Sequence, residues 1–177
     1  AEESAAAGGP LPAALQDIAW TEPKRSKTAL SVLAKDFARA FQREQWGVNG
    51  RVQPRFFEDS FQFRDPDVST SGLQEYARGT STVLSGCRAD VVDVELLERE
   101  NAFVIRWRIE GTANVPFPGL KIKPYIVSST FGVSSAGLVS SEVDAFSIPT
   151  WDILLSAFFP DLPFLAPPEP PVKSEYA

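Results

Sequence analysis

The sequence predicts an α+β fold: a cone-shaped, strongly curved antiparallel sheet wrapped around a long N-terminal helix, with an extended arm at each end. Three observations lead to this prediction. Residues 26–44 carry apolar side chains at helical spacing. After residue 86 the apolar pattern changes to a period of two, which is typical of strands. Residues 1–26 and 161–177 show neither period and are rich in small residues or proline.

The long helix is predicted over residues 26–44, where four apolar residues form one stripe: Leu30, Leu33, Phe37 and Phe41. A second helix is predicted over residues 69–86, with Ser71 as its N-cap. A short closing helix is predicted over residues 151–159, with Thr150 as its N-cap and Pro160 after its end. Each helix is expected to turn one apolar face toward the sheet.

Four strands are predicted as an antiparallel meander over residues 90–98, 102–111, 121–133 and 138–148. A shorter strand is predicted at residues 61–63. The alternation is clearest in the second strand of the meander, because side chains two residues apart point to the same face. Its inward residues are predicted to be Phe103, Ile105, Trp107 and Ile109, which leaves Arg106 and Arg108 on the outer face.

The chain divides into an extended N-terminal arm (1–26), one α+β domain (27–160) and a C-terminal arm (161–177). The segment 160–177 contains six prolines, so it favours polyproline geometry and excludes a helix or central strand. Arms of this composition are expected to be ordered by docking, and a partner protein is the favoured surface.

Composition excludes several classes of function. The chain has 177 residues, 44% of them hydrophobic, and a net charge of −6, so a nucleic-acid partner is not expected. It has no histidine, which removes Ser-His-Asp triads and most zinc sites. No apolar run approaches the roughly 18 residues that a membrane span requires. The first residues contain no methionine and resemble a new N-terminus, which predicts that a targeting peptide has been removed.

The stretch FFEDSFQFRDPD at residues 56–67 gathers four carboxylates, those of Glu58, Asp59, Asp65 and Asp67. The favoured interpretation is a structural corner, because Asp65 precedes Pro66 and aspartate commonly caps backbone amides in such turns. An acid/base site is the alternative. A metal site is a third, weaker one, because the ligand series of a calcium loop is missing.

The acid/base alternative draws on four weak candidates, Asp59, Asp65, Tyr76 and Asp144, and on a relay of Asp144 with Arg106 or Arg108. The predicted outward direction of both arginines argues against the relay. No cofactor and no metal are predicted. Haem would have only Cys87 or a tyrosine as an axial ligand. The single cysteine is interpreted as a small buried side chain.

The order of elements and one set of residues resemble the nuclear-transport-factor-2-like (NTF2-like) superfamily, also called SnoaL-like or cystatin-like. The matching residues are Phe57, Asp59, Phe63, Asp65, Pro66, Gly72 and Tyr76. The segments VIRWRIEGTANVPFPG and WDILLSAFFP further resemble a branch of unknown function from plants, algae and cyanobacteria. The resemblance covers residues 28–160. It implies a pocket between the long helix and the concave sheet face, and it implies a plastid location.

Two functions follow as hypotheses. The leading one is a non-catalytic plastid accessory or scaffold protein, in the stroma or thylakoid lumen, whose arms dock onto subunits of a larger assembly, for which a photosynthetic complex is expected. The alternative is a protein that binds an isoprenoid, pigment, tetrapyrrole or lipid-like molecule, or an enzyme of the isomerase or hydrolase kind. The residues expected to line its pocket are Phe37, Phe41, Trp46, Phe61, Trp107, Phe131 and Trp151. Convergent ionisable groups inside the cone would favour the alternative.

Overall fold

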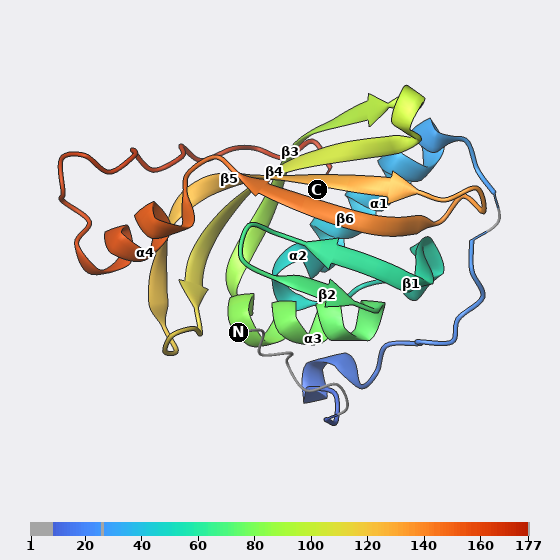
Figure 1. Ribbon diagram of the computed structural model, residues 1–177, viewed down its shortest axis with the longest axis horizontal. Helices are drawn as coiled ribbons and strands as arrows, with labels where there is room; N and C mark the ends of the chain where they lie inside the picture. Colours follow the sequence, from blue (N-terminus) through green and yellow to red (C-terminus); the bar gives the residue numbers. More distant parts are fainter. Residues whose placement is uncertain (1–8, 26, 177) are drawn as a thin grey trace.

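One curved sheet of six strands forms the frame of the molecule in the computed structural model, which describes residues 9–25 and 27–176 (Figure 1). The spatial order is β2-β1-β6-β5-β4-β3. The strands are β1 (Phe57–Arg64), β2 (Ser69–Ser71), β3 (Gly86–Leu97), β4 (Ala102–Ala113), β5 (Leu120–Val133) and β6 (Val139–Phe146). The predicted meander is confirmed as β3 to β6. The sheet is mixed rather than wholly antiparallel, because β1 lies parallel to β6.

The helices lie mainly on the concave side of the sheet (Figure 1). They are α1 (Leu30–Glu44), α2 (Trp46–Asn49), α3 (Leu73–Leu84) and α4 (Thr150–Phe158), with short 3-10 turns at η1 (Ala13–Leu15), η2 (Pro54–Phe56) and η3 (Glu98–Glu100). In the described part of the chain, no helix combines the length and the apolar character needed to cross a membrane.

The two N-cap predictions were wrong for the same reason. Ser71 belongs to β2 and pairs with Gln62, so Gly72, with φ of 94°, precedes the first residue of α3. Thr150 lies inside α4, and its hydroxyl donates to Asp67 Oδ2 at 2.7 Å. Both side chains have found partners on β1 or the turn after it, so tertiary contacts replaced local capping.

The core is centred on Phe37, which is fully buried at the middle of α1. Its ring lies 4.7–5.5 Å from five other aromatic rings, those of Trp46, Phe56, Phe57, Phe103 and Phe131. Most of these pairs are tilted or edge-to-face, which the quadrupoles of the rings favour. Helix α1 is therefore fixed in the concavity of the sheet by one interlocked aromatic cluster.

Strand β4 confirms the predicted alternation. Phe103, Ile105, Trp107 and Ile109 are at most 2% exposed on the concave face. Arg106 points to the outer face, where it pairs with Asp93 and Glu95 of β3. Arg108 also points outward, yet it is only 3% exposed. Something other than the concave core must therefore cover the outer face around Arg108.

The C-terminal arm provides this cover. We call residues 160–176 the strap; it crosses the outer face of the sheet toward the C-terminus (Figure 1). Its Glu169 donates a backbone N–H to Pro124 O at 2.9 Å and accepts Arg108 Nε at 3.1 Å. Ala166 accepts Lys123 Nζ at 2.7 Å. The strap thus lies on its own domain, and its docking onto a partner stays a prediction.

The N-terminal arm also packs on its own domain over its described residues, 9–25. Leu15 of η1 is fully buried in the core. Asp17 accepts two hydrogen bonds from Arg51, both at 2.9 Å, and Arg78 donates to Pro10 O at 3.2 Å. The residues on which the processed-terminus prediction rests, 1–8, lie outside the described ones.

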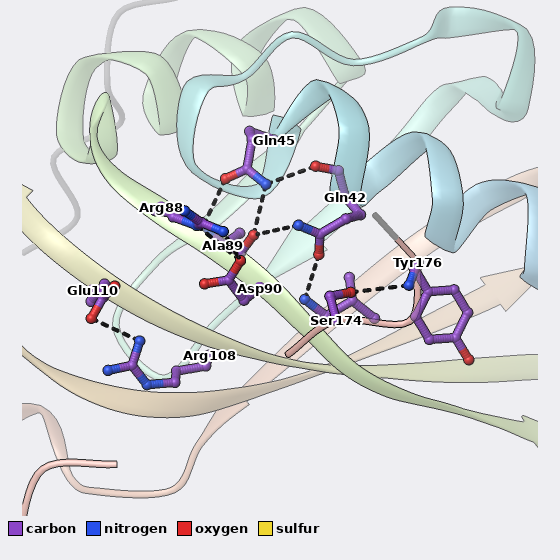
Figure 2. Close-up of polar contacts among 10 residues, drawn as sticks. Gln42, Gln45, Arg88, Ala89, Asp90, Arg108, Glu110, Ser174 and Tyr176 are labelled. Carbon is purple, nitrogen blue, oxygen red and sulfur yellow. Dashed lines mark hydrogen bonds and ion pairs between the residues drawn. The ribbon is translucent and has the colours of Figure 1, made fainter. Parts of the chain in front are cut away.

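Two glutamines at the C-terminal end of α1 protect the free edge of the sheet. Figure 2 shows Gln42 and Gln45 reaching β3, which is an edge strand. The Gln45 amide both donates to Ala89 O, at 2.7 Å, and accepts Ala89 N–H, at 2.8 Å, while Gln42 Oε1 accepts Val91 N–H at 2.7 Å. These bonds satisfy backbone groups that would otherwise be open to another strand.

Replacing Phe37 by alanine tests the role of this cluster. We expect Phe37→Ala to lower the free energy of unfolding by about 3–5 kcal/mol, because five ring contacts and a buried volume are lost together. Val32→Ala on the exposed side of the same helix is the control, with a change within about 0.5 kcal/mol. Denaturant unfolding measures both. Equal losses in the two variants would contradict a core centred on Phe37.

Candidate functional site

A cavity of about 180 Å³ lies further along the concave face, between α3, the β1–β2 hairpin and the sheet. Its wall is mostly apolar: Phe63, Val68, Val83, Leu84, Trp107, Ile109, Val127 and Phe146. The polar side chains in the wall are Asp65, Thr70, Tyr76, Thr80, Tyr125 and Asp144. Gly79 leaves room on the α3 side, since a Cβ added there would meet nothing within 4 Å. Mostly apolar walls with a few convergent polar groups are typical of small-molecule sites.

Two carboxylates of β6 lie together inside the fold. Glu142 and Asp144 are two residues apart in a strand, so both point to the concave side. Glu142 is 1% exposed, and its Oε1 accepts the Tyr76 hydroxyl at 3.5 Å. Asp144 lies opposite Ser129 of β5, whose hydroxyl oxygen accepts the Trp107 indole N–H at 2.9 Å. Residues of α3, β4, β5 and β6 thus converge on one acidic pair.

Burial sets the protonation of this pair. It raises the pKa of Asp144 from 3.8 to about 7, although hydrogen bonding with Ser129 works against the rise. Burial, followed by the charge of Asp144, raises the pKa of Glu142 well above its usual value. Near neutral pH the proton of the pair is therefore held by Glu142, and Asp144 exchanges between its charged and neutral forms. A carboxylate whose pKa matches the ambient pH is suited to general acid/base work.

The two tyrosines of the cavity remain neutral donors. Burial, followed by the negative charge of Glu142, raises the pKa of Tyr76 well above 10. Burial also raises the pKa of Tyr125, which is 6% exposed. Both hydroxyls therefore keep their protons and can donate hydrogen bonds to an oxygen on a bound molecule.

Some buried oxygen atoms of the site accept no hydrogen bond from the described part of the chain. Within the described residues, Asp144 Oδ1, Glu142 Oε2 and Thr70 Oγ1 are buried and have no hydrogen-bond partner. Buried polar atoms are normally paired, because leaving one unpaired costs about 1–3 kcal/mol. Asp144 and Thr70 both line the cavity. A ligand carrying a polar group would satisfy them.

The four weak acid/base candidates divide between the cavity and the surface. Asp144 and Tyr76 line the cavity, and Asp65 lies at its β1–β2 side. Asp65 Oδ1 also accepts Asp67 N–H at 2.7 Å and Val68 N–H at 2.6 Å, which is the predicted structural corner. Asp59 is separate from the cavity, because its side chain is 91% exposed and pairs with Lys24.

Glu142 is the functional candidate that sequence reasoning missed. The signal was present, since Glu142 and Asp144 share one face of a predicted strand. Acidic residues at alternate strand positions usually mark a solvated face, and nothing local indicates that this face is the buried one. Only the position of β6 between β1 and β5 decides it.

The predicted pocket residues lie mostly elsewhere. Trp107 lines the cavity. Phe37, Phe41, Trp46, Phe61 and Phe131 are fully buried in the core, where they pack against other side chains and do not line the cavity. Trp151 is 55% exposed on α4. The aromatic residues thus fill one end of the concavity, and the cavity opens at the other.

The structure gives no support to the arginine relay, and little to a metal site or to ligation by Cys87, within the residues that it describes. Arg106 and Arg108 both leave the concave face, so neither can form a relay with Asp144. Among residues 9–25 and 27–176, no three His, Cys, Asp or Glu side chains gather as metal ligands would. Burial raises the pKa of the Cys87 thiol to about 11, so it is protonated and unsuited to ligation near neutral pH.

The raised pKa values predict a pH-dependent stability. Folded Asp144 keeps its proton up to about pH 7, whereas the unfolded chain releases it near 3.8. The free energy of unfolding should therefore fall as pH rises between these values, by as much as about 4 kcal/mol.

The variant Asp144→Asn should flatten this dependence and be more stable than the natural protein above pH 7. Unfolding by denaturant at a series of pH values measures the difference. Asp59→Asn, at an exposed carboxylate that pairs with Lys24, is the control and should leave the slope between about pH 4 and 7 unchanged. Parallel pH profiles for Asp144→Asn and the natural protein would show that Asp144 titrates normally.

Comparison with known proteins identifies the fold. No protein-family model matches the sequence, and no curated protein matches it either. A SnoaL-like polyketide cyclase from Jannaschia sp. CCS1, so described provisionally, gives a TM-score of 0.55 at 13% identity, covering 75% of this chain and 96% of that chain. A polyketide cyclase from Acidithiobacillus ferrooxidans, also a provisional description, gives 0.55 at 14% identity over 75% and 99%.

A third solved structure agrees. AclR from Streptomyces galilaeus, described provisionally as a hydroxylase, gives a TM-score of 0.52 at 16% identity and covers 76% of this chain and 85% of that one. At these identities the likeness concerns the fold alone. The plastid branch stays a prediction, whereas the fold is the one that the resemblance at residues Phe57–Tyr76 predicted: the chain has the SnoaL-like, NTF2-like fold.

Proposed function

We propose that the chain binds a small, mostly apolar molecule in the cavity and transfers a proton on it, with Asp144 as the general base. The observation that carries this proposal is a carboxylate with a pKa of about 7 in an apolar wall, beside a protonated Glu142. Pairs of acidic groups whose environments give them different pKa values are a recurring acid/base arrangement in enzymes. The alternative formulated from the sequence is thus preferred over the scaffold hypothesis.

The proton has a complete path within the site. Ionised Asp144 takes a proton from a carbon next to a carbonyl group, and the carbonyl oxygen becomes negative. A neutral tyrosine hydroxyl of the cavity, such as Tyr125, donates a hydrogen bond to that oxygen. Asp144 then returns the proton to the same carbon or, where a conjugated double bond extends the enolate, to the far carbon of that double bond, and the carbonyl group is restored. The steps move one proton and one electron pair with no net change of oxidation state, so the reaction class is isomerisation by proton transfer.

The size of the cavity limits the ligand. An apolar protein cavity of about 150 Å³ holds one benzene molecule. The 180 Å³ found here therefore suits a compact molecule of about ten non-hydrogen atoms, with one polar group facing Asp144 and Thr70. Two structures with the same fold are described as cyclases, which is consistent with a small-molecule function.

Hydrogen exchange tests the proposal. Small cyclic ketones are incubated with the protein in heavy water, and loss of the signal of the hydrogen next to the carbonyl is followed by NMR. The natural protein should accelerate exchange with an apparent pKa of about 7, because only ionised Asp144 is a base. Asp144→Asn should lower the accelerated rate about 10²- to 10⁴-fold.

Two further variants sharpen the result. Asp59→Asn makes the same substitution at an exposed carboxylate outside the cavity and should keep the full rate. Tyr125→Phe removes one donor and should lower the rate by up to about 10²-fold. An acceleration that survives Asp144→Asn, or one lost equally in Asp59→Asn, would contradict the assignment of the base.

Docking onto a partner protein is a second candidate function, because the molecule has an exposed apolar surface. We define the apolar lobe as the exposed side chains of α4, the loop after it and the β4–β5 hairpin: Val115, Phe117, Trp151, Leu154, Phe158, Phe159 and Phe164, each at least 45% exposed. Phe117 and Phe158 bring the hairpin and α4 together, with ring centroids 5.8 Å apart. Exposed apolar patches of this kind mark interaction sites. The lobe, which includes Phe164 of the C-terminal arm, would then contact the plastid assembly predicted from the sequence.

A pull-down from solubilised thylakoid membranes tests this second candidate. We expect Trp151→Ser combined with Phe159→Ser to lower recovery of the partner at least about tenfold, because two large anchors are lost. Val32→Ser, at an exposed position on α1, should leave recovery unchanged. Equal recovery by both variants would remove the lobe as a docking surface.

A further inference from the structure

A second hollow lies outside the acidic cavity and has the opposite charge. It is a groove of about 480 Å³ lined by four arginines, Arg25, Arg39, Arg43 and Arg55, together with Asp36, Ala40 and Phe56. None of these residues lines the cavity that contains Asp144. We call this hollow the arginine groove.

Three separate segments supply the arginines. Arg39 and Arg43 lie one turn apart on α1, so their side chains share one helix face. Arg25 comes from the N-terminal arm and Arg55 from η2. The two are tied together, because Arg25 donates its backbone N–H to Arg55 O at 2.9 Å. Tertiary structure therefore assembles the groove from distant parts of the sequence.

A buried aromatic ring orients two of the guanidinium groups. Phe56 is 1% exposed. The Arg25 and Arg55 guanidinium carbons lie 5.4 and 5.0 Å from the centre of its ring, within cation–π range. Arg25 also pairs with Asp36 at 2.5 Å. Both groups are thus held in place before any ligand arrives, which lowers the entropy cost of binding.

The groove has positive charge in excess of its partners. Asp36 is the one acidic residue in its lining, and Glu44 pairs with Arg43 from beside it. Within the described residues, Arg39 forms no ion pair. The whole chain nevertheless carries a net charge of −6. A concentration of arginines in an acidic protein makes this groove the place where an anion would be attracted.

We propose that the arginine groove binds a phosphate group in its dianionic form. Guanidinium groups donate paired N–H bonds that match phosphate oxygens, and several groups converging from different sides suit a tetrahedral anion. A nucleic acid is not the expected source, because a long polyanion would be repelled by the negative remainder of the surface. The phosphate belongs to a small phosphomonoester or to a lipid headgroup.

Titrations followed by heteronuclear NMR of the arginine side-chain N–H groups test the site. Inorganic phosphate, phenyl phosphate and vesicles containing phosphatidic acid are added separately, above the second phosphate pKa of about 6. We expect saturable shifts confined to Arg25, Arg39, Arg43 and Arg55, with a dissociation constant of about 1 mM or lower for a soluble phosphate. Raising the salt concentration should weaken the binding.

The choice of variant makes the test specific. Arg39→Gln should weaken binding about tenfold, the loss expected for a hydrogen bond to a charged group. Arg99→Gln removes the same charge at an exposed site on η3 and should have no effect. Saturation by the soluble phosphates assigns a small phosphomonoester, and binding to vesicles alone assigns a lipid headgroup. No saturable response to any probe, or equal weakening in both variants, would overturn the proposal.

Discussion

The packing of Phe37 is the constraint on which the rest of the structure depends. Its ring contacts residues of α2, η2, β1, β4 and β5. One side chain therefore holds α1 both against the segment that follows it in the sequence and against the central strands of the sheet. A sheet that curves around a helix can close only where side chains fill its concavity completely. Around Phe103 and Phe131 the aromatic rings are fully buried and pack against one another. Close packing at this end is what lets the other end remain hollow without loss of the fold.

The hollow end places acidic side chains where they would be unfavourable in a purely structural protein. Helix α3 presents Gly79 and Thr80 toward the cavity, and larger residues there would fill it. Strand β6 lies inside the sheet, and of the acidic side chains on its concave face Glu142 is buried and Asp144 is half-buried in the cavity wall. Burial disfavours the charged forms of Glu142 and Asp144, so the pKa values of both carboxyl groups are raised. Such a cost is common at functional sites, where stability is given up for chemistry.

The outer features of the molecule are separate from this interior. The strap buries Arg108 on the convex face, and the N-terminal arm buries Leu15, but neither arm contributes a side chain to the cavity wall. The arginine groove and the apolar lobe lie outside the cavity wall, although Arg25 of the groove comes from the N-terminal arm and Phe164 of the lobe comes from the strap. The proposed chemistry in the cavity, the proposed anion binding in the groove and the proposed contact through the lobe can therefore be tested one at a time by substitution, because no residue is shared among the three sites.

The sequence by itself determined the class of fold and much of its order. Helical spacing located α1 and α3, and alternation located β4 with its inward tryptophan and outward arginines, because both patterns reflect local geometry that burial only reinforces. It also identified Asp65 as a turn residue. Tertiary structure alone decided that β1 pairs parallel to β6, that Glu142 joins Asp144 in the interior, that most of the predicted pocket aromatics form a closed core, and that both arms lie on their own domain. Each of these depends on which distant segments become neighbours, and no local period of the sequence carries that information.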